Sequence, residues 1–274
     1  MFFKMESVIA IFMFRWYEVL SERRIQFEVR TDDGVFRSHQ VVVATGPFQV
    51  PFVPAAAAAL DPSVTQIHSA EYRNPNKLPE GPVLVVGGGN SGFQIAEELA
   101  ATRKVNLSIS RKYLELPQRL MGKDLFWWLD TFNLIRIPAD SPIGRRVRAR
   151  GEFIIGTSSR KLKRMGVRFR TRAIDASRRS VSLSDGTSLD VNLVIWATGY
   201  RSDYSWIHVP EIFKEDRLSH RRGVTDVPGL YFLGLSWQHS RGSALLGFVD
   251  EDATYLIKYI SRYARKPEAT KIAA

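Results

Sequence analysis

The stretch Pro82-Val83-Leu84-Val85-Val86-Gly87-Gly88-Gly89-Asn90-Ser91-Gly92 decides the fold of this chain. An apolar run leads into a glycine turn of the form G-x-G-x-x-G, and residues 93–103 have the spacing of a helix. This order is typical of the first half of a βαβ unit that binds a dinucleotide. Gly87 would permit the tight turn, Gly89 would let the backbone approach a pyrophosphate, and Gly92 would let the helix lie close to the strand. The alternative is a structural turn without a ligand.

The residues on either side of the turn support the dinucleotide reading. Asn90 and Ser91 are expected to cap the helix, whose free N–H groups and positive dipole end would hold phosphates. A second strand follows at residues 105–109 and ends at Arg111 and Lys112. An NAD site usually has an acidic residue about 20 positions beyond the turn, whereas a 2′-phosphate requires cations there. The sequence therefore favours NADP(H), unless both cations are simply solvated.

Several classes of site are excluded by composition. Gly89 to Phe93 does not match the G-x-S-x-G elbow of a serine hydrolase, because Phe93 occupies the last position. The 274 residues include no cysteine, so disulfides, thiolate metal sites and cysteine nucleophiles cannot occur. The five histidines lack ligand spacing, and no structural metal is expected. Without cysteines, a reducing cytoplasm is the expected compartment.

Positive charge is concentrated in one region. Residues 101–180 contain 20 Lys and Arg against 6 Asp and Glu, a net charge of about +14, whereas the whole chain carries +11. No recognisable nucleic-acid-binding module accompanies these cations. A solvated basic face that also attracts an anionic cofactor is therefore favoured over a nucleic-acid interface.

Residues 1–24 are expected to be a lead-in of uncertain structure. The apolar run at 8–14 has seven residues, far fewer than a membrane span requires. No small-residue cleavage site follows it, which argues against a signal peptide.

Two copies of one pattern occur farther along the chain. Strand 27–31, the hairpin signal Asp33-Gly34 and the buried strand 40–43 lead to Ala-Thr-Gly at 44–46. A strand at 181–183, then Asp185-Gly186 and an apolar strand lead to Ala-Thr-Gly at 197–199. The repeat predicts two related dinucleotide-type sheets rather than two unrelated strands.

The remaining segments are predicted from local pattern. Residues 61–80 resemble a connector, and His68 is expected to anchor it rather than contact a cofactor. The aromatic stretch 124–132 has helical spacing and is expected to pack in the core rather than line a substrate pocket. Residues 161–170 predict a helix end followed by a strand. After a buried strand at 230–233, a Gly/Ser loop precedes a long amphipathic helix expected to run from Ser243 to about Tyr263. That loop and helix could meet a ligand or simply complete the domain.

Taken together, these motifs resemble the two-dinucleotide-binding flavoproteins, in particular the flavin-containing monooxygenase-like oxidoreductases. The likeness rests on the motifs at 42–46, 85–92, 195–200 and 229–234, and it spans about residues 25–260 in consistent order. The resemblance implies an α/β fold in which a Rossmann-like NADP-binding domain is inserted into a partial FAD-binding domain. The expected boundaries are 25–60 and 200–274 for the FAD-binding parts, 61–80 for the connector and 81–199 for the NADP-binding domain.

The resemblance also assigns cofactor-binding residues and an activity. NADPH would contact Gly87, Gly89, Asn90, Ser91, Gly92, Arg111 and Lys112. FAD would lie along Thr45, Gly46, Gly234, Ser243, Ala244 and Leu245, and Thr198 and Gly199 would approach the cofactors from the second Ala-Thr-Gly. The implied reaction is hydride transfer from NADPH to flavin, followed by activation of O2 and oxygenation of a soft nucleophile or carbonyl compound. No catalytic side chain is predicted.

The chain departs from the family pattern in two ways. No glycine fingerprint for FAD precedes Ala44, and the motif F-x-G-x-x-x-H-x-x-x-Y aligns only at His68 and Tyr72. The alternative expectation is a truncated, catalytically silent NADP(H)-binding remnant. Because disulfide reductases of the same plan need a cysteine pair, the absence of cysteine favours the monooxygenase-like branch. The expected partner is a small-molecule substrate, without nucleic acid or membrane.

Overall fold

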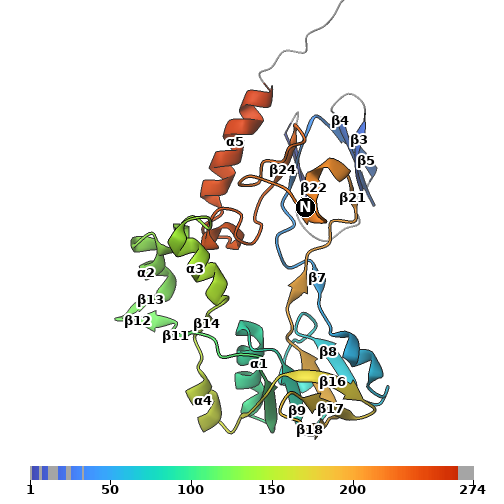
Figure 1. Cartoon of the computed structure of the whole chain (residues 1–274), viewed down its shortest axis with the longest axis vertical. Helices are drawn as coiled ribbons and strands as arrows, with labels where there is room; N and C mark the ends of the chain where they lie inside the picture. Colours follow the sequence, from blue (N-terminus) through green and yellow to red (C-terminus); the bar gives the residue numbers. More distant parts are fainter. Residues whose placement is uncertain (1, 6–7, 12–17, 23–25, 33, 265–274) are drawn as a thin grey trace, which may run out of the picture. The chain divides into compact units, whose positions relative to one another are not determined.

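A computed structural model describes residues 2–5, 8–11, 18–22, 26–32 and 34–264 of the chain (Figure 1). The chain forms two compact units. The first unit comprises Met1–Gln49, Asn133–Arg146 and Ser202–Ala274. The second unit comprises Val50–Phe132 and Val147–Arg201.

A five-stranded sheet forms the centre of the second unit. Its order is β15-β10-β9-β19-β8, and every neighbouring pair is parallel. The bounds are β8 (Thr65–His68), β9 (Val83–Val86), β10 (Val105–Ser108), β15 (Arg168–Arg170) and β19 (Leu193–Trp196). The expected α/β class with a parallel sheet is therefore confirmed. The segment expected to be a connector supplies β8, an edge strand of this sheet.

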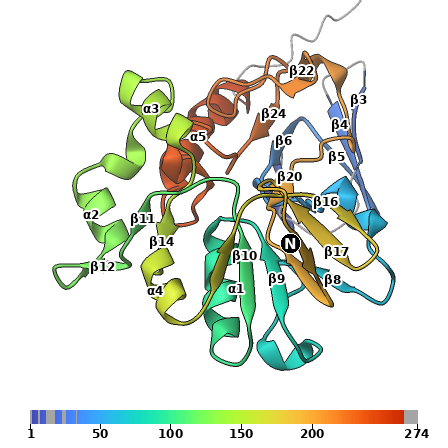
Figure 2. The same ribbon diagram turned by 60° about the horizontal axis from the view of Figure 1, so that its bottom comes forward.

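Helices cover one face of the parallel sheet. Helix α1 (Asn90–Ala100) follows β9 and lies beside it, and α4 (Ser159–Arg164) precedes β15 and lies beside α1 (Figure 2). Val83 and Val85 of β9 pack in a buried cluster with Leu99 of α1 and Leu162 of α4. Central parallel strands are apolar on both faces, which explains why β9 reads as an uninterrupted apolar run.

The other face of the sheet is covered by β-structure. Leu84 and Val86, which alternate with the helix-facing residues of β9, join a second buried cluster with Val194 and Trp196 of β19. The covering elements are η1 (Ala55–Ala59) and the antiparallel sheet of β16 (Ala173–Ser177), β17 (Ser180–Leu183) and β18 (Ser188–Asp190). The hairpin predicted at Asp185-Gly186 joins β17 to β18 and is confirmed.

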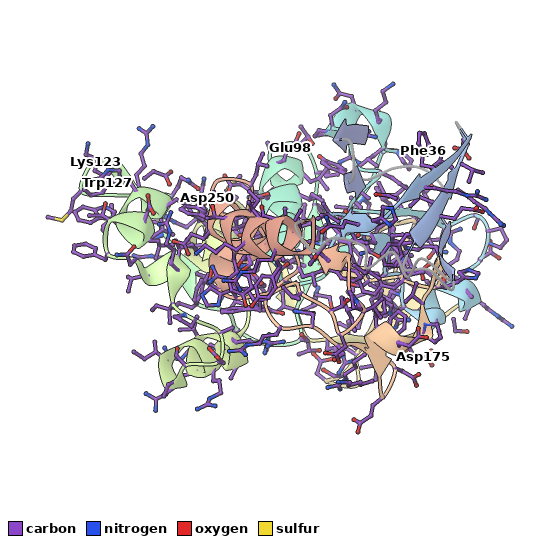
Figure 3. The ribbon with its side chains drawn as sticks, turned by 90° about the horizontal axis from the view of Figure 1, so that it is seen from above. Phe36, Glu98, Lys123, Trp127, Asp175 and Asp250 are labelled. Carbon is purple, nitrogen blue, oxygen red and sulfur yellow. The ribbon has the colours of Figure 1, made fainter. Side chains whose placement is uncertain are left out.

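The aromatic stretch at 124–132 does not lie in the core. It forms α2 (Leu125–Thr131), in which only Leu125 is buried, and Trp127 and Phe132 are 44% and 61% exposed. Trp128 stacks on Phe132, and the Lys123 ammonium lies over the Trp127 ring (Figure 3). The prediction of core packing was wrong because helical spacing does not show which face another element covers.

Short elements complete the second unit and the segment that follows it. β7 (Val50–Pro51) pairs antiparallel with β20 (Tyr200–Arg201), and β11 (Glu115–Leu116) pairs parallel with β14 (Ile154–Ile155). β12 (Arg119–Leu120) and β13 (Lys123–Asp124) form a hairpin. The remaining elements are η2 (Pro75–Lys77) and α3 (Pro142–Arg150).

The first unit contains two four-stranded sheets. One has the order β1-β2-β6-β24, with β1 (Phe2–Met5), β2 (Val8–Ile11), β6 (Gln40–Val43) and β24 (Leu230–Phe232). The other has the order β21-β3-β4-β5, with β3 (Glu18–Glu22), β4 (Gln26–Thr31), β5 (Gly34–Ser38) and β21 (Ile207–His208). The predicted hairpin at Gly34 is present, and the expected lead-in contributes three strands.

Strand β6 is buried on both sides. Val41 and Val43 belong to one core cluster with Phe27 and Phe232, whereas Val42 belongs to another with Leu256 of α5 (Asp250–Ala264). The other elements of the unit are η3 (Leu134–Arg136), η4 (Pro210–Ile212), β22 (Phe213–Lys214), β23 (Arg217–Leu218) and η5 (Arg241–Ala244). No helix in the described ranges is long and apolar enough to cross a membrane.

Candidate functional site

The glycine turn lies between β9 and α1, as predicted. The Gly87 N–H donates to the Ser108 carbonyl oxygen at 2.9 Å, and Gly87 has a φ of +134°. A Cβ atom at this position would lie 2.0 Å from the Ala197 carbonyl oxygen. Glycine is therefore required both by the backbone conformation and by the close approach of the strand end after β19.

The other two glycines of the motif differ in what surrounds them. A Cβ on Gly92 would lie 2.0 Å from the Gly87 carbonyl oxygen, so this glycine allows α1 to pack closely on the turn. A Cβ on Gly89 would meet no atom within 4 Å. The space beside Gly89 is thus open, which is where a pyrophosphate would approach the backbone.

Helix α1 begins without a side-chain cap. Gly89 is the N-cap residue, no side chain bonds to the cap, and the first intrahelical bond runs from the Phe93 N–H to the Gly89 carbonyl oxygen at 3.1 Å. The N–H groups of residues 90–92 therefore have no acceptor within the helix. An anion at this end would satisfy them and would be favoured by the helix dipole.

Asn90 has a different role from the one predicted. Its Nδ2 donates to the Phe153 carbonyl oxygen at 2.7 Å, and its Oδ1 accepts from the Ile155 N–H at 2.8 Å. The carboxamide thus ties β14 to the glycine turn, and the expectation that it caps α1 is wrong. Ser91 lies exposed in the first turn of the helix and provides no cap either.

Arg111 and Lys112 follow β10 and are both exposed. The Arg111 guanidinium lies over the Tyr113 ring, with 4.9 Å between Cζ and the ring centroid. Its Nη2 also lies against Gly151, where a Cβ atom would come within 2.3 Å. Tyr113 in turn packs on the glycine turn, because a Cβ on Gly88 would lie 2.8 Å from its ring. The first predicted cation is therefore held close to the turn.

The first unit brings together part of the predicted FAD edge. Thr45 and Gly46 follow β6, Gly234 follows β24, and these strands are parallel neighbours. Gly46 and Gly234 have φ of +68° and +82°, and a Cβ on Gly46 would lie 4.0 Å from the Gly234 carbonyl oxygen. The Gln49 Nε2 donates to Thr45 Oγ1 at 3.0 Å and to the Gly46 carbonyl oxygen at 2.9 Å. Sequence reasoning missed Gln49, which lies in the loop between β6 and β7 and belongs to no recognisable motif.

The segment 243–245 does not open a helix. Ser243 lies within the short η5, where its Oγ accepts from the N–H groups of His239 and Ser240 at 3.0 Å each. Ala244 and Leu245 are partly exposed, and α5 begins only at Asp250. The expected helix start was wrong because the Ser243 hydroxyl closes a local capping box, whereas the acidic residues 250–252 occupy the first turn of α5.

Thr198 and Gly199 stabilise the end of the second Ala-Thr-Gly. Thr198 Oγ1 bonds to the Phe52 carbonyl oxygen, and the Gly199 carbonyl oxygen accepts from the Phe52 N–H at 2.9 Å. The same carbonyl lies 3.0 Å from Nε2 of buried His68, whose Nδ1 accepts from the Ala70 N–H at 3.1 Å. His68 is therefore engaged with backbone on both ring nitrogens, as the anchor reading expects.

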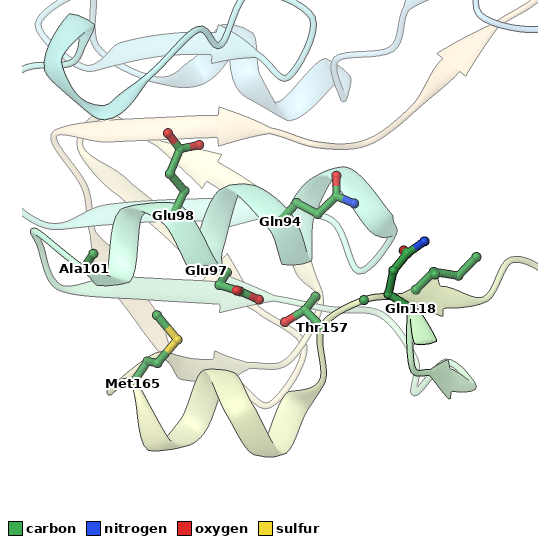
Figure 4. Close-up of a pocket in the computed structure, with 9 residues that line it drawn as sticks. Gln94, Glu97, Glu98, Ala101, Gln118, Thr157 and Met165 are labelled. Atoms are coloured by element: carbon green, nitrogen blue, oxygen red, sulfur yellow. The ribbon is translucent and has the colours of Figure 1, made fainter. Parts of the chain in front are cut away.

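A groove of about 600 Å³ lies elsewhere on the second unit (Figure 4). Glu97 and Glu98 of α1 line it together with Thr157 and Met165. Burial opposes ionisation of Glu97, but its ion pair with Lys161 and the nearby Thr157 hydroxyl lower its pKa. Burial raises the pKa of Tyr72, and the negative charge of Glu98 adds to the effect. The groove includes none of the predicted cofactor residues.

Among the residues that the structure describes, no three His, Asp or Glu side chains gather in a way that could hold a metal ion. What the described geometry offers is a backbone anion site beside α1 and a glycine-lined strand edge in the first unit.

Comparison with known proteins identifies the family. Residues 9–125 match the family described as pyridine nucleotide-disulphide oxidoreductase. An uncharacterized CzcO-like oxidoreductase from Geobacillus kaustophilus is 44% identical over 236 residues, which cover 85% of this chain and 68% of the relative. The chain belongs to the CzcO-like oxidoreductase family. The CzcO oxidoreductase of Bacillus subtilis is 38% identical, with coverage of 89% of this chain and 72% of the relative.

Solved structures share the fold of this CzcO-like chain. A flavin-containing monooxygenase from Stenotrophomonas maltophilia superposes with a TM-score of 0.70 at 22% identity, covering 91% of this chain and 70% of that one. The expectation of an oxidoreductase is confirmed at the level of the family by the CzcO relatives, and the likeness to the monooxygenase structure confirms the fold. The roles of individual residues stay predictions.

Proposed function

We propose that this chain is an FAD- and NADPH-dependent monooxygenase-like oxidoreductase acting on a small-molecule substrate. The chemistry that the two cofactors supply when bound is hydride transfer from NADPH to flavin, followed by reaction of reduced flavin with O2 to oxygenate the substrate. The second unit would bind NADPH and the first would bind FAD. A reducing cytoplasm is the proposed compartment, because the chain has no cysteine.

The observation that carries the proposal is the open space beside Gly89. A side chain there would enter the region faced by the N–H groups of residues 90–92, and none is present. Backbone donors at a helix N-terminus bind phosphate without requiring a charged side chain. The glycine turn can therefore receive the pyrophosphate of a dinucleotide, while Gly87 and Gly92 keep the turn and α1 in a fixed relation.

The proposed preference for NADPH over NADH rests on the two cations that follow β10. Arg111 and Lys112 offer positive charge at the position where an NAD site would have a carboxylate. A planar guanidinium suits bidentate recognition of a phosphate, and stacking on Tyr113 orients this one. These residues would orient NADPH by its 2′-phosphate.

For FAD, the first unit would contribute the edge formed by Thr45, Gly46 and Gly234. Glycines at both strand ends leave the backbone without side chains that would obstruct a flat ligand, and Gln49 holds the loop after β6 in place. The residues here would position the flavin and shield it from water.

The test is spectroscopic. The chain is purified in the presence of FAD, passed through a desalting column and scanned for flavin absorbance, and NADPH is then added without oxygen. Retained flavin that bleaches with NADPH, and recovers on admission of air, supports the proposal. A colourless protein that still binds NADPH contradicts the flavoenzyme and supports a silent NADP(H)-binding chain.

A further inference from the structure

A second cavity, of about 370 Å³, opens next to the predicted cations of the second unit. Its lining residues come from α1, from the ends of β10 and β15, from the loop after β10 and from α4: Phe93, Ile109, Lys112, Tyr113, Glu115, Ser159, Lys163 and Phe169. Phe93 and Phe169 meet edge to face, with 5.9 Å between ring centroids. Phe93 is buried, so the accessible aromatic wall of the cavity comes from the partly exposed Phe169 and Tyr113.

Positive charge enters this cavity from two directions. Lys112 comes from the loop after β10, and Lys163 comes from α4, about 50 residues later. The Lys163 ammonium lies 5.6 Å from the centre of the Phe169 ring. Glu115 contributes one carboxylate, so the lining carries a net charge of +1, and Arg111 lies over Tyr113 at the same wall.

Lys161 and Lys163 of α4 differ in the side chains that they contact. Lys161 forms an ion pair with Glu97 of α1. Within the described part of the chain, Lys163 forms no ion pair and is positioned only by its contact with Phe169. A cation on an aromatic surface that is not held in an ion pair is suited to a phosphate monoester attached to a planar base.

We infer that this cavity receives the adenosine 2′-phosphate end of NADP and that Lys163 is a specificity-determining residue for it. This inference rests on the proposed function, since it extends the same dinucleotide site. Lys112 and Lys163 would contact the phosphate from opposite elements, and the Phe169 ring would contact the base. Position 163 carries no motif by which sequence alone would identify it, because the fold brings α4 to the end of β10.

The experiment uses two isomeric probes, adenosine 2′-monophosphate and adenosine 5′-monophosphate, which have the same base and the same charge. Their dissociation constants are measured by calorimetry on the full chain. Loss of a charge-assisted hydrogen bond weakens binding by about tenfold or more. Lys163→Met should therefore weaken 2′-monophosphate binding about tenfold while changing 5′-monophosphate binding little, and Lys163→Arg should restore most of the loss.

Lys161→Met is the matched control, because it removes the same charge from the same helix outside the cavity. It should leave both probes within about twofold, since exposed ion pairs contribute little. Glu115→Gln should tighten binding of the 2′-monophosphate. Equal loss in Lys161→Met and Lys163→Met would indicate only a general charge effect and would overturn the inference.

Failure of the inference can be told apart from failure of the proposed function. If NADPH binds and Arg111→Asp weakens it but Lys163→Met does not, the function stands and the role of Lys163 is wrong. If NADPH does not bind but the 2′-monophosphate binds in a Lys163-dependent manner, the phosphate site stands and the proposed enzyme is wrong. Absence of 2′-monophosphate binding by the unmodified chain overturns the inference outright.

Discussion

The backbone of Gly92 packs against the backbone of Gly87, because a Cβ atom added to Gly92 would lie 2.0 Å from the Gly87 carbonyl oxygen. No flexible side chain is available to move aside at this contact. The start of α1 is therefore fixed against the turn that precedes it, and the N–H groups at the helix end have a defined direction.

Gly92→Ala should destabilise the second unit. The added methyl group must displace either the Gly87 carbonyl or the whole helix, and overpacking of this kind costs about 1–3 kcal/mol. Urea unfolding followed by circular dichroism would measure the loss. An unchanged unfolding midpoint would mean that the turn and α1 are not packed as described.

Gly89→Val should leave folding intact and abolish NADPH binding. A Cβ atom at this position meets no protein atom within 4 Å, and the φ of −81° at Gly89 is acceptable for any residue, but the methyl groups would occupy the space for the pyrophosphate. Fluorescence titration with NADPH measures the effect. Gly247→Val is the matched control, because a Cβ at Gly247 also meets nothing within 4 Å. Normal NADPH binding by Gly89→Val would contradict the site.

Arg111→Asp should change coenzyme preference. A carboxylate would repel the 2′-phosphate and could accept from a ribose hydroxyl, so affinity for NADPH should fall roughly ten- to a hundredfold while affinity for NADH changes much less. Dissociation constants for both coenzymes give the ratio. An equal change in both would rule out a 2′-phosphate contact at this residue.

Asn90→Ala should loosen β14 rather than melt α1. The substitution removes the bonds to the Phe153 carbonyl and the Ile155 N–H, each worth about 1 kcal/mol or more when a buried partner is left unsatisfied. Limited proteolysis should cleave faster around residues 150–157. Asn90→Asp keeps an acceptor for the Ile155 N–H and should cleave at an intermediate rate. Identical digestion of all three proteins would argue against the tether.

His220→Asn should make stability less sensitive to acid. Burial lowers the pKa of His220 below its ordinary value of 6.5, although Asp252 opposes this, and Nδ1 accepts from the Gly223 N–H at 3.2 Å. The unfolded chain then binds the proton more readily than the folded one, so stability falls as pH decreases through about 6.5. Asparagine can replace the acceptor without titrating. The unfolding midpoints of the two proteins, compared between pH 8 and pH 5.5, should diverge toward low pH.

Much of the fold was predictable because it depends on local pattern. The apolar run 83–86, the glycine turn and the hairpins at Gly34 and Gly186 all appear where their residues indicate. These elements are determined by backbone conformation and by alternation of apolar residues, which a single sequence carries. The helix end at Met165 and the strand after it were predictable for the same reason.

The failures concern contacts between segments distant in the sequence. The residues around Asn90 predict that it caps α1, but its hydrogen-bond partners are 63 and 65 residues away in the sequence. Nothing near Trp127 indicates that α2 leaves it exposed, and nothing near Lys163 indicates a cavity shared with Lys112. Such relationships arise from the way the sheet assembles, so local pattern does not contain them.

Gly151 gives the Arg111 guanidinium the room that it occupies, although 40 positions separate the two residues. Any larger side chain at 151 would be strained by the φ of +81° at this position and would also have to displace the Arg111 head group. If Arg111 contacts the 2′-phosphate as proposed, position 151 gives protein designers a second place from which to tune coenzyme selectivity while the arginine itself is retained.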